Sequence, residues 1–246
     1  MRQRGDERGW ALLDALLDDE SGPGLAALAG TVLGLPEQGR YAVAVVPAGR
    51  GGTGSRPADA HGMRFLWRPR PDREIAVVAL GDAEPAAVAA LVAGGRPGPG
   101  GVSPVVDGLA ALGAARRLAE AALLTCGTDG ADEEGVICLE GRVPVALVAG
   151  QPALAAYLAV DVFGPLLARD PADRALLVST LDAWLDCGGS AGRTAVRLCC
   201  HRNTVLNRLR RLEELTSRSL SRPRELVEVV LALEAVRLRP VPSGDR

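Results

Sequence analysis

The stretch that most constrains this chain is Ser190 to Thr216, SAGRTAVRLCCHRNTVLNRLRRLEELT. Its spacing predicts two helices around a tight turn. Ser190 is suited to an N-cap, because its hydroxyl can accept a hydrogen bond from a free N–H of the first helical turn. Cys199-Cys200-His201 is expected to be a short non-helical step. In the second helix an apolar stripe recurs at the i, i+4, i+7 and i+11 spacing, at Val205, Leu209, Leu212 and Thr216.

The side chains opposite this stripe are polar and basic. At about 100° per residue, the outward positions begin with short polar side chains and continue with arginines. A helix that enters a DNA major groove needs amide and guanidinium groups for base edges and cations for phosphates. Arg208 faces partly toward the stripe, so it either binds phosphate or pairs with an acid inside its own domain. The candidate DNA-binding residues are Arg202, Asn203, Thr204, Asn207, Arg208, Arg210 and Arg211.

The distribution of charge points to the same surface. The chain contains no Lys, and all 28 basic residues are Arg, within a formal net charge of −2. Residues 190–224 carry nine Arg against two Glu, a local charge of +7, so the remainder is acidic. A basic block in an acidic protein is typical of nucleic-acid binding. A merely solvated arginine-rich face would leave the helix pair beneath it unexplained.

Upstream of this stretch, short apolar runs alternate with helical patterns. Tyr41 to Val46 is a continuous apolar run, which predicts a buried strand. Residues 63–68 and 74–80 predict two strands around a hairpin-like turn. The alternation as a whole predicts an α/β layer domain. Further strands are expected near 102–106 and 135–140, and further helices at 7–19, 25–35, 84–93, 109–125, 152–168, 173–187 and after Pro223.

The run HRNTVLNRLRRLEELT, between a short helix and a second amphipathic one, closely resembles the C-terminal helix-turn-helix of PucR/CdaR-type bacterial transcription regulators. The resemblance covers residues 173–238. Thr194, Cys199, Cys200 and Ser217 depart from the residues usual in that family, which predicts a looser turn. GVSPVVDGLAALGAARRLAEAAL resembles a strand–helix unit of the GGDEF-like middle domain of these regulators, and residues 12–35 resemble its helical lead-in.

The resemblance implies a DNA-binding transcription regulator of the α+β class, in which a degenerate GGDEF-like α/β layer domain precedes an all-α helix-turn-helix domain. Catalytic relatives of the middle domain hold their metals with acids at the end of the first strand and a Gly-Gly-acid turn. Here the first strand has no acid, and the turn is Arg-Pro-Arg-Pro-Asp-Arg. We therefore expect no catalytic, cofactor-binding or metal-binding residues. The middle domain would be a scaffold, a dimer surface or a pocket for an effector of unknown identity.

Two other motifs were weighed. Residues 49–54 match GxGxxG after a strand, but no hydrophobic helical pattern follows to hold a pyrophosphate. Cys199, Cys200 and His201 could form a metal or redox site, although three adjacent ligands rarely converge on one ion. Packing thiols, with His201 capping the second helix or contacting a phosphate, fit better. The alternative functions are an α/β nucleotide-binding protein or enzyme with a basic helical appendage, and a protein-interaction module.

The remaining expectations concern location and organisation. Five Cys without CxxC spacing, no signal peptide and no apolar run of membrane-spanning length predict a cytoplasmic protein with reduced thiols and no membrane partner. Double-stranded DNA and a second copy of the chain are the expected partners. The upstream sensor domain of many such regulators is not in the chain, which indicates either a regulator without one or a shortened chain. The expected divisions are a lead-in at 1–35, an α/β domain at 36–165 and a helix-turn-helix domain at 166–246.

Overall fold

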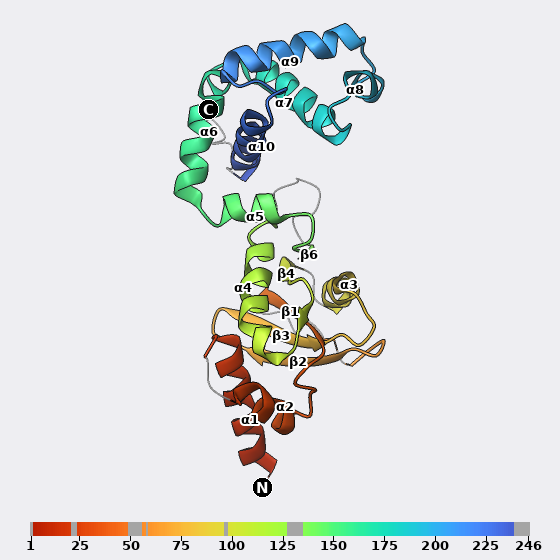
Figure 1. Ribbon diagram of the computed structural model, residues 1–246, viewed down its shortest axis with the longest axis vertical. Helices are drawn as coiled ribbons and strands as arrows, with labels where there is room; N and C mark the ends of the chain where they lie inside the picture. Colours follow the sequence, from red (N-terminus) through yellow and green to blue (C-terminus); the bar gives the residue numbers. More distant parts are fainter. Residues whose placement is uncertain are drawn as a thin grey trace. The chain divides into compact units, whose positions relative to one another are not determined.

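The computed structural model describes residues 2–20, 24–48, 56–57, 59–95, 98–126 and 135–238, with side chains from residue 7 onward. The chain divides into two compact units, Met1–Gly150 and Gln151–Arg246 (Figure 1). This division differs from the expected boundaries at 35/36 and 165/166. The N-terminal helices pack into the core of the first unit, and the helix that begins at Pro152 packs into the core of the second.

The first unit is built on a sheet in the order β2-β3-β1-β4-β6, with β5 paired to β1. The predicted hairpin is present, because β2 (Arg64–Pro69) and β3 (Arg73–Ala79) pair antiparallel. Helices α1 (Arg2–Leu17), α2 (Leu25–Leu33) and α4 (Leu112–Leu123) cover one face of the sheet. Helix α3 (Pro85–Gly95) covers the other face. The expected α/β layer domain is thus confirmed, with three layers (Figure 1).

Strand β1 (Arg40–Pro47) shows why its sequence is apolar without interruption. Tyr41, Val43 and Val45 enter the core beneath α1 and α4. The alternate residues Ala42 and Ala44 enter the core beneath α3. A strand that is buried on both faces has no position for a polar side chain, so the predicted buried strand is confirmed.

The single strand expected near 102–106 is two strands in the structure. β4 (Gly100–Val102) pairs Val102 with Ala44, and β5 (Val106–Asp107) pairs Val106 with Tyr41. The five residues from Val102 to Val106 therefore lie opposite the four from Tyr41 to Ala44, as in a β-bulge. Ser103 supports the interruption, because its Oγ accepts the N–H of Val43 at 2.9 Å. The next residue is proline, which has no N–H to donate.

The end of the first unit contains an element that the sequence patterns did not predict. Strand β6 (Val136–Cys138) pairs parallel with β4, close to the expected range. Helix α5 (Val143–Ala149) follows it and is too short for a clear helical period. Ala146 and Val148 are buried, whereas Val143 and Leu147 stay exposed.

The second unit consists of five helices among its described residues: α6 (Pro152–Leu167), α7 (Pro171–Asp186), α8 (Ala191–Arg197), α9 (Arg202–Thr216) and α10 (Pro223–Leu238). Their buried side chains form one core, to which α6 contributes Val162, Phe163 and Leu166. This packing is the reason that α6 belongs to the second unit. Within the described parts of the chain, no single helix has both the length and the apolarity of a membrane span.

Candidate nucleic-acid interface

The turn between α8 and α9 is formed by short local contacts. Ser190 caps α8, because its Oγ accepts the N–H of Arg193 at 3.4 Å. His201 caps α9, and its Nδ1 accepts the N–H of Asn203 at 3.2 Å. Between them Cys199 has φ of 50°, a left-handed conformation that L-residues other than glycine adopt at a cost. The predicted helix–turn–helix and both caps are confirmed.

The cysteine and histidine of this turn have structural positions. Cys200 packs against the helical core, whereas Cys199 is exposed. Since His201 uses Nδ1 for the cap, the cap assigned to it from sequence is confirmed. Across the described ranges, no three His, Cys, Asp or Glu side chains are grouped as metal ligands.

Helix α9 is anchored by the stripe that its spacing predicted. Val205, Leu209, Leu212 and Thr216 are all buried, with exposed fractions of 7% or less. Val205, Leu209 and Leu212 pack in the core that also holds Leu177 of α7. A helix buried along one stripe has a fixed rotation about its axis, so its opposite face is also fixed.

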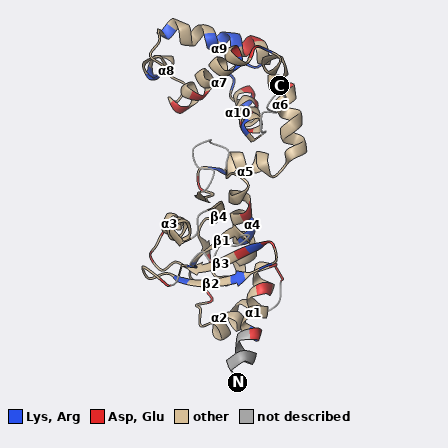
Figure 2. Ribbon diagram, turned by 180° about the vertical axis from the view of Figure 1, so that it is seen from behind, with Lys and Arg blue, Asp and Glu red and all other residues tan. Residues whose placement is uncertain are grey.

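The face opposite the stripe is open and carries polar and basic side chains. Of the candidate residues, Thr204 and Arg208 are partly buried and the others are exposed. Basic segments are visible along α9 and at α8 (Figure 2). The exposed candidates are Arg202, Asn203, Asn207, Arg210 and Arg211.

The two flanks of this face differ in how their arginines are bound. On one flank, Arg211 Nη2 pairs with Asp173 Oδ2 of α7 at 2.8 Å, and Arg208 Nη1 donates to Thr180 Oγ1 at 3.4 Å. On the other flank, neither Arg202 nor Arg210 has an acid partner in the described part of the chain. The hydrogen bond that the structure gives Arg210 runs from its Nη1 to Asn207 Oδ1, at 3.4 Å. Among the described residues Arg208 has no acid partner, so the internal ion pair that was one of its two expected roles is not observed.

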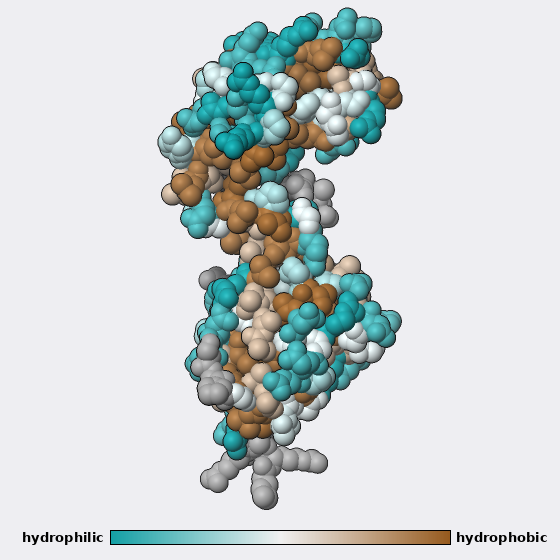
Figure 3. Space-filling model, viewed as in Figure 1, coloured by the Kyte–Doolittle hydropathy of each residue, from teal (hydrophilic) through white to brown (hydrophobic). Residues whose placement is uncertain are grey.

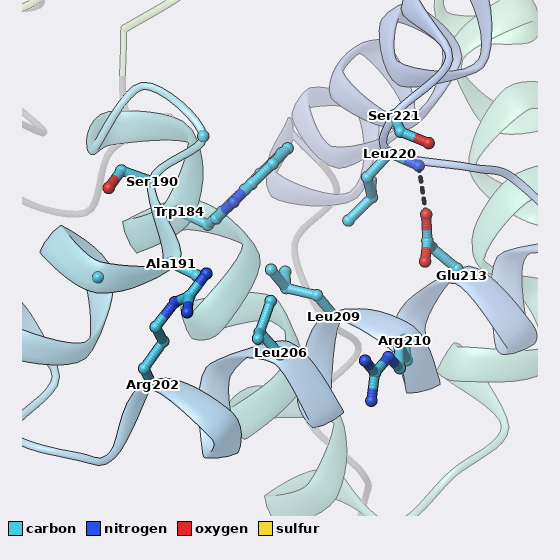
Figure 4. Close-up of a pocket in the computed structure, with 12 residues that line it drawn as sticks. Trp184, Ser190, Ala191, Arg202, Leu206, Leu209, Arg210, Glu213, Leu220 and Ser221 are labelled. Carbon is cyan, nitrogen blue, oxygen red and sulfur yellow. Dashed lines mark hydrogen bonds between the residues drawn. The ribbon is translucent and has the colours of Figure 1, made fainter.

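A groove of about 650 Å³ runs beside the flank that carries the unpaired arginines (Figure 4). Its walls are α9, the end of α7, the start of α8 and the segment at Leu220. Arg202 extends toward Ala191, and Leu206 and Leu209 extend toward Trp184 (Figure 4). Trp184 comes from the end of α7, and the helical pattern expected for residues 173–187 did not indicate that it lines a groove. The sequence feature that could have indicated this is the Gly188-Gly189 pair shortly after Trp184. In the structure both glycines have positive φ.

The end of α9 is closed off by hydrogen bonds. Glu213 Oε1 accepts the N–H of Leu220 at 2.8 Å and is also bonded to Ser219 Oγ. Glu225 Oε2 accepts the N–H of Ser219 at 2.6 Å. Hydrogen bonding to Arg222, and then to this backbone N–H, lowers the pKa of Glu225. These contacts fix the connection from α9 to α10.

The turn of the β2–β3 hairpin is occupied by ion pairs. Arg70 Nη2 contacts Asp18 Oδ2 at 2.9 Å, and Arg73 Nη1 contacts Glu120 Oε1 at 2.8 Å. Hydrogen bonding to Arg73 lowers the pKa of Asp72. Arg70 and Arg73 of this turn are therefore bound by Asp18, which directly follows α1, and by Glu120 of α4. The GxGxxG stretch at 49–54 lies outside the described residues.

Comparison with known proteins identifies both regions. Residues 177–235 match the PucR C-terminal helix-turn-helix domain, and residues 18–125 match the GGDEF-like domain. Uncharacterized protein Rv2242 of Mycobacterium tuberculosis and Uncharacterized protein Mb2266 of Mycobacterium bovis are each 37% identical over 83 residues. That stretch covers 34% of this chain and only 19% of each relative. The solved regulator of polyketide synthase expression from Bifidobacterium adolescentis aligns with 94% of this chain and 92% of its own, at 21% identity and a TM-score of 0.42.

Proposed function

We propose that this protein, which carries matches to a GGDEF-like domain and to the PucR C-terminal helix-turn-helix domain in one chain, is a DNA-binding transcription regulator of the PucR/CdaR type. The observation that carries the proposal is the contrast between the two faces of α9. Its apolar stripe is buried, and its opposite face exposes two asparagines and two arginines that no acid of the described chain neutralises. Such a face suits both base edges and phosphates.

Within α9 we propose a division between base contacts and phosphate contacts. Asn203, Thr204 and Asn207 lie near the start of the helix, where docking of this motif brings side chains to base edges. An asparagine can bond to adenine N6 and N7 together. Arg202 and Arg210 flank this patch and would contact phosphates. Arg211 is the least suited of the candidates, because its pairing with Asp173 would have to be broken first.

The test is direct selection of binding sites. The whole protein is mixed with a library of random duplexes, the retained duplexes are amplified, and the selected site is compared with a scrambled duplex of equal composition. We expect a sequence preference together with an affinity that falls as salt concentration rises. Equal affinity for all duplexes would reduce the protein to a nonspecific binder, and no binding at low salt would refute the proposal.

The middle domain, in this proposal, is not an enzyme. Its first strand carries no acid that could hold a metal. Asp18 and Glu120, the acids beside its hairpin turn, are paired with Arg70 and Arg73. Purified protein with Mg²⁺ or Mn²⁺ should turn over neither GTP nor ATP. Metal-dependent production of a cyclic dinucleotide above a protein-free control would contradict this and favour the nucleotide-enzyme alternative.

We also propose that the protein acts as a homodimer under control of an effector that acts through the middle domain. One helix-turn-helix covers a small footprint, and paired units bind half-sites about one DNA turn apart. The helices near Trp10 and Leu109 pack on the sheet of their own unit. Exposed apolar side chains remain on α6, at Leu154, Tyr157 and Val160. Hydrophobic patches are visible on the surface of the second unit in Figure 3. Light scattering of the free and the DNA-bound protein tests the dimer, and a monomer in both states would refute it.

A further inference from the structure

The groove beside α9 has a chemical character that the base-reading role of α9 does not use. It combines an apolar floor, made of Leu206, Leu209 and the Trp184 side chain, with two cations at its edge. Arg202 and Arg210 line it, and neither has an acid partner in the described part of the chain. The one acid in its lining, Glu213, is turned to the N–H of Leu220 (Figure 4). The groove is therefore cationic along one side and apolar along its floor.

The indole of Trp184 adds a free hydrogen-bond donor. Its N–H has no partner among the described residues, whereas the Trp67 N–H donates to the Pro57 carbonyl at 3.1 Å. Trp184 is only partly buried, so this N–H can meet a group from outside the protein. Gly189 packs against the ring, where an added Cβ would lie 3.4 Å from it. The backbone of the Gly188-Gly189 turn thus holds the indole in place at the groove.

Resting on the proposed function, we propose that this groove seats one strand of the sugar–phosphate backbone of the bound DNA. Arg202 and Arg210 bind two consecutive phosphates of that strand, and the Trp184 N–H donates to an oxygen of one of these two phosphates. The deoxyribose packs over Leu206 and the indole. Two features of the surface favour a DNA backbone strand as the ligand of this groove. The unpaired cations complement a phosphodiester chain, and the groove shares Arg202 and Arg210 with the proposed DNA-facing side of α9, so the two surfaces are continuous.

Binding of a strand in this protein groove makes the phosphate contacts on the two sides of the DNA major groove unequal. Phosphates on the side of Arg202 and Arg210 meet free guanidinium groups. Phosphates on the other side meet Arg208 and Arg211, which are already bonded to Thr180 and Asp173. A phosphate contact removes about one counterion from the salt dependence only where the cation is free to make it. The strand in the seat therefore carries most of the electrostatic contribution of α9.

The experiment neutralises the DNA one phosphate at a time. The probe is a fluorescent duplex carrying the site selected with the wild-type protein, made as a set in which each member has a single uncharged methylphosphonate linkage. Affinity is measured for wild type, Arg202→Ala, Arg210→Ala, Trp184→Phe and the paired control Arg211→Ala. Trp184→Phe keeps the ring and removes the donor. Circular dichroism and melting of each variant show that it is folded.

We expect one or two adjacent linkages, on one strand, where neutralisation weakens wild-type binding about tenfold. Neutralising one of these linkages should have little further effect on the variant, Arg202→Ala or Arg210→Ala, that lacks the arginine bound to that phosphate, because the lost contact is the same. Trp184→Phe should weaken binding severalfold at the same place, and Arg211→Ala should show no such coupling. Intrinsic fluorescence should change when the unlabelled duplex is added, and this change should be absent from Trp184→Phe.

Two results would refute the binding of a DNA backbone strand in this groove while leaving the proposed function intact. One is salt-sensitive, sequence-selective binding with no coupling between any linkage and Arg202, Arg210 or Trp184. The other is coupling of equal size at linkages facing Arg211. Should the wild-type protein bind no duplex at low salt, the proposed function itself would fail, and that result is distinct from either of these.

Discussion

The arginines of the β2–β3 hairpin in the first unit and two arginines on the outward face of α9 in the second unit have different surroundings. In the hairpin, arginines are bound by acids, as in the contacts of Arg68 with Asp14 and of Arg73 with Glu120. In the second unit, Arg202 and Arg210 on α9 have no acid partner among the described residues. The hairpin arginines thus stabilise the fold through ion pairs, whereas the two arginines on α9 leave positive charge exposed. The pairing of an arginine, more than the number of arginines, indicates where an anionic partner can bind.

The largest expected effect comes from the core that fixes α9. Leu212 is 1% exposed, so Leu212→Ala should destabilise the second unit by about 2–5 kcal/mol, through lost burial and the cavity that remains. DNA affinity should fall with it, because the orientation of α9 depends on this stripe. The matched control is Leu154→Ala in the same unit, where the side chain is 66% exposed and the cost should be small. Thermal melting checks both, and equal shifts would contradict the packing described for α9.

The sequence predicted the parts of this molecule that depend on local periodicity. The buried stripe of α9 and the two-sided burial of β1 both follow from which residues alternate with which. It failed where distant residues decide the outcome. Asp173 binds Arg211 from 38 positions away along the chain, and no spacing rule indicates that pairing. The boundary at Gly150 likewise depends on the packing of α6 in the helical core, which the linker-like pattern of residues 152–168 concealed.

Base reading is the next effect in size, and it separates two residues of one helix. Asn207→Ala should weaken binding to the selected site by about 1–3 kcal/mol and relax the preference at one base pair. On scrambled DNA the loss should be much smaller. Because Arg210 contacts Asn207, the variant also frees that guanidinium, and the salt dependence should stay unchanged. Titrations on both duplexes at several salt concentrations measure this. Equal losses on both duplexes would assign Asn207 to the backbone.

A pair of arginine variants tests the comparison between the units directly. Arg68→Ala should destabilise the first unit by about 1–2 kcal/mol, because Arg68 donates two hydrogen bonds to Asp14 in a partly buried site, and DNA affinity should be unaffected. Arg210→Ala should do the reverse: it should leave the melting temperature unchanged and reduce affinity for every sequence about tenfold, with a salt slope smaller by about one counterion. If Arg210→Ala lowers the melting temperature and Arg68→Ala the affinity, the contrast is wrong.

The turn of the helix–turn–helix offers a smaller effect of opposite sign. Cys199 is held at φ of 50°, whereas the Gly188-Gly189 turn uses glycines at positive φ. Cys199→Gly should therefore stabilise the second unit by about 0.5–1 kcal/mol, since relief of the left-handed strain exceeds the added freedom of the unfolded chain. Cys187→Gly is the control, because Cys187 has φ of −83° and glycine there brings only the entropic cost. Melting curves that show both variants less stable would mean that the turn is not strained.

The smallest effect concerns an acid whose arginine does stay paired in the second unit. Arg222 Nη1 lies 2.9 Å from Glu225 Oε1, and this hydrogen bond is the main reason that the pKa of Glu225 is lowered from its ordinary value of 4.5. A carboxyl whose folded pKa lies below its unfolded value stabilises the fold above the unfolded pKa, and that contribution is lost as pH falls through the folded pKa. The loop at Ser219 should therefore loosen as the pH falls through the lowered pKa of Glu225, since Glu225 also accepts the Ser219 N–H. The titration midpoint of the Glu225 carboxyl, followed by carbon NMR, should lie below 4.5 and rise in Arg222→Ala.

Arg224→Ala removes a neighbouring guanidinium with no acid partner in the described chain, so it should leave the midpoint in place. A midpoint that moves equally in both variants would show that general positive charge, and not the paired arginine, holds this carboxyl ionised.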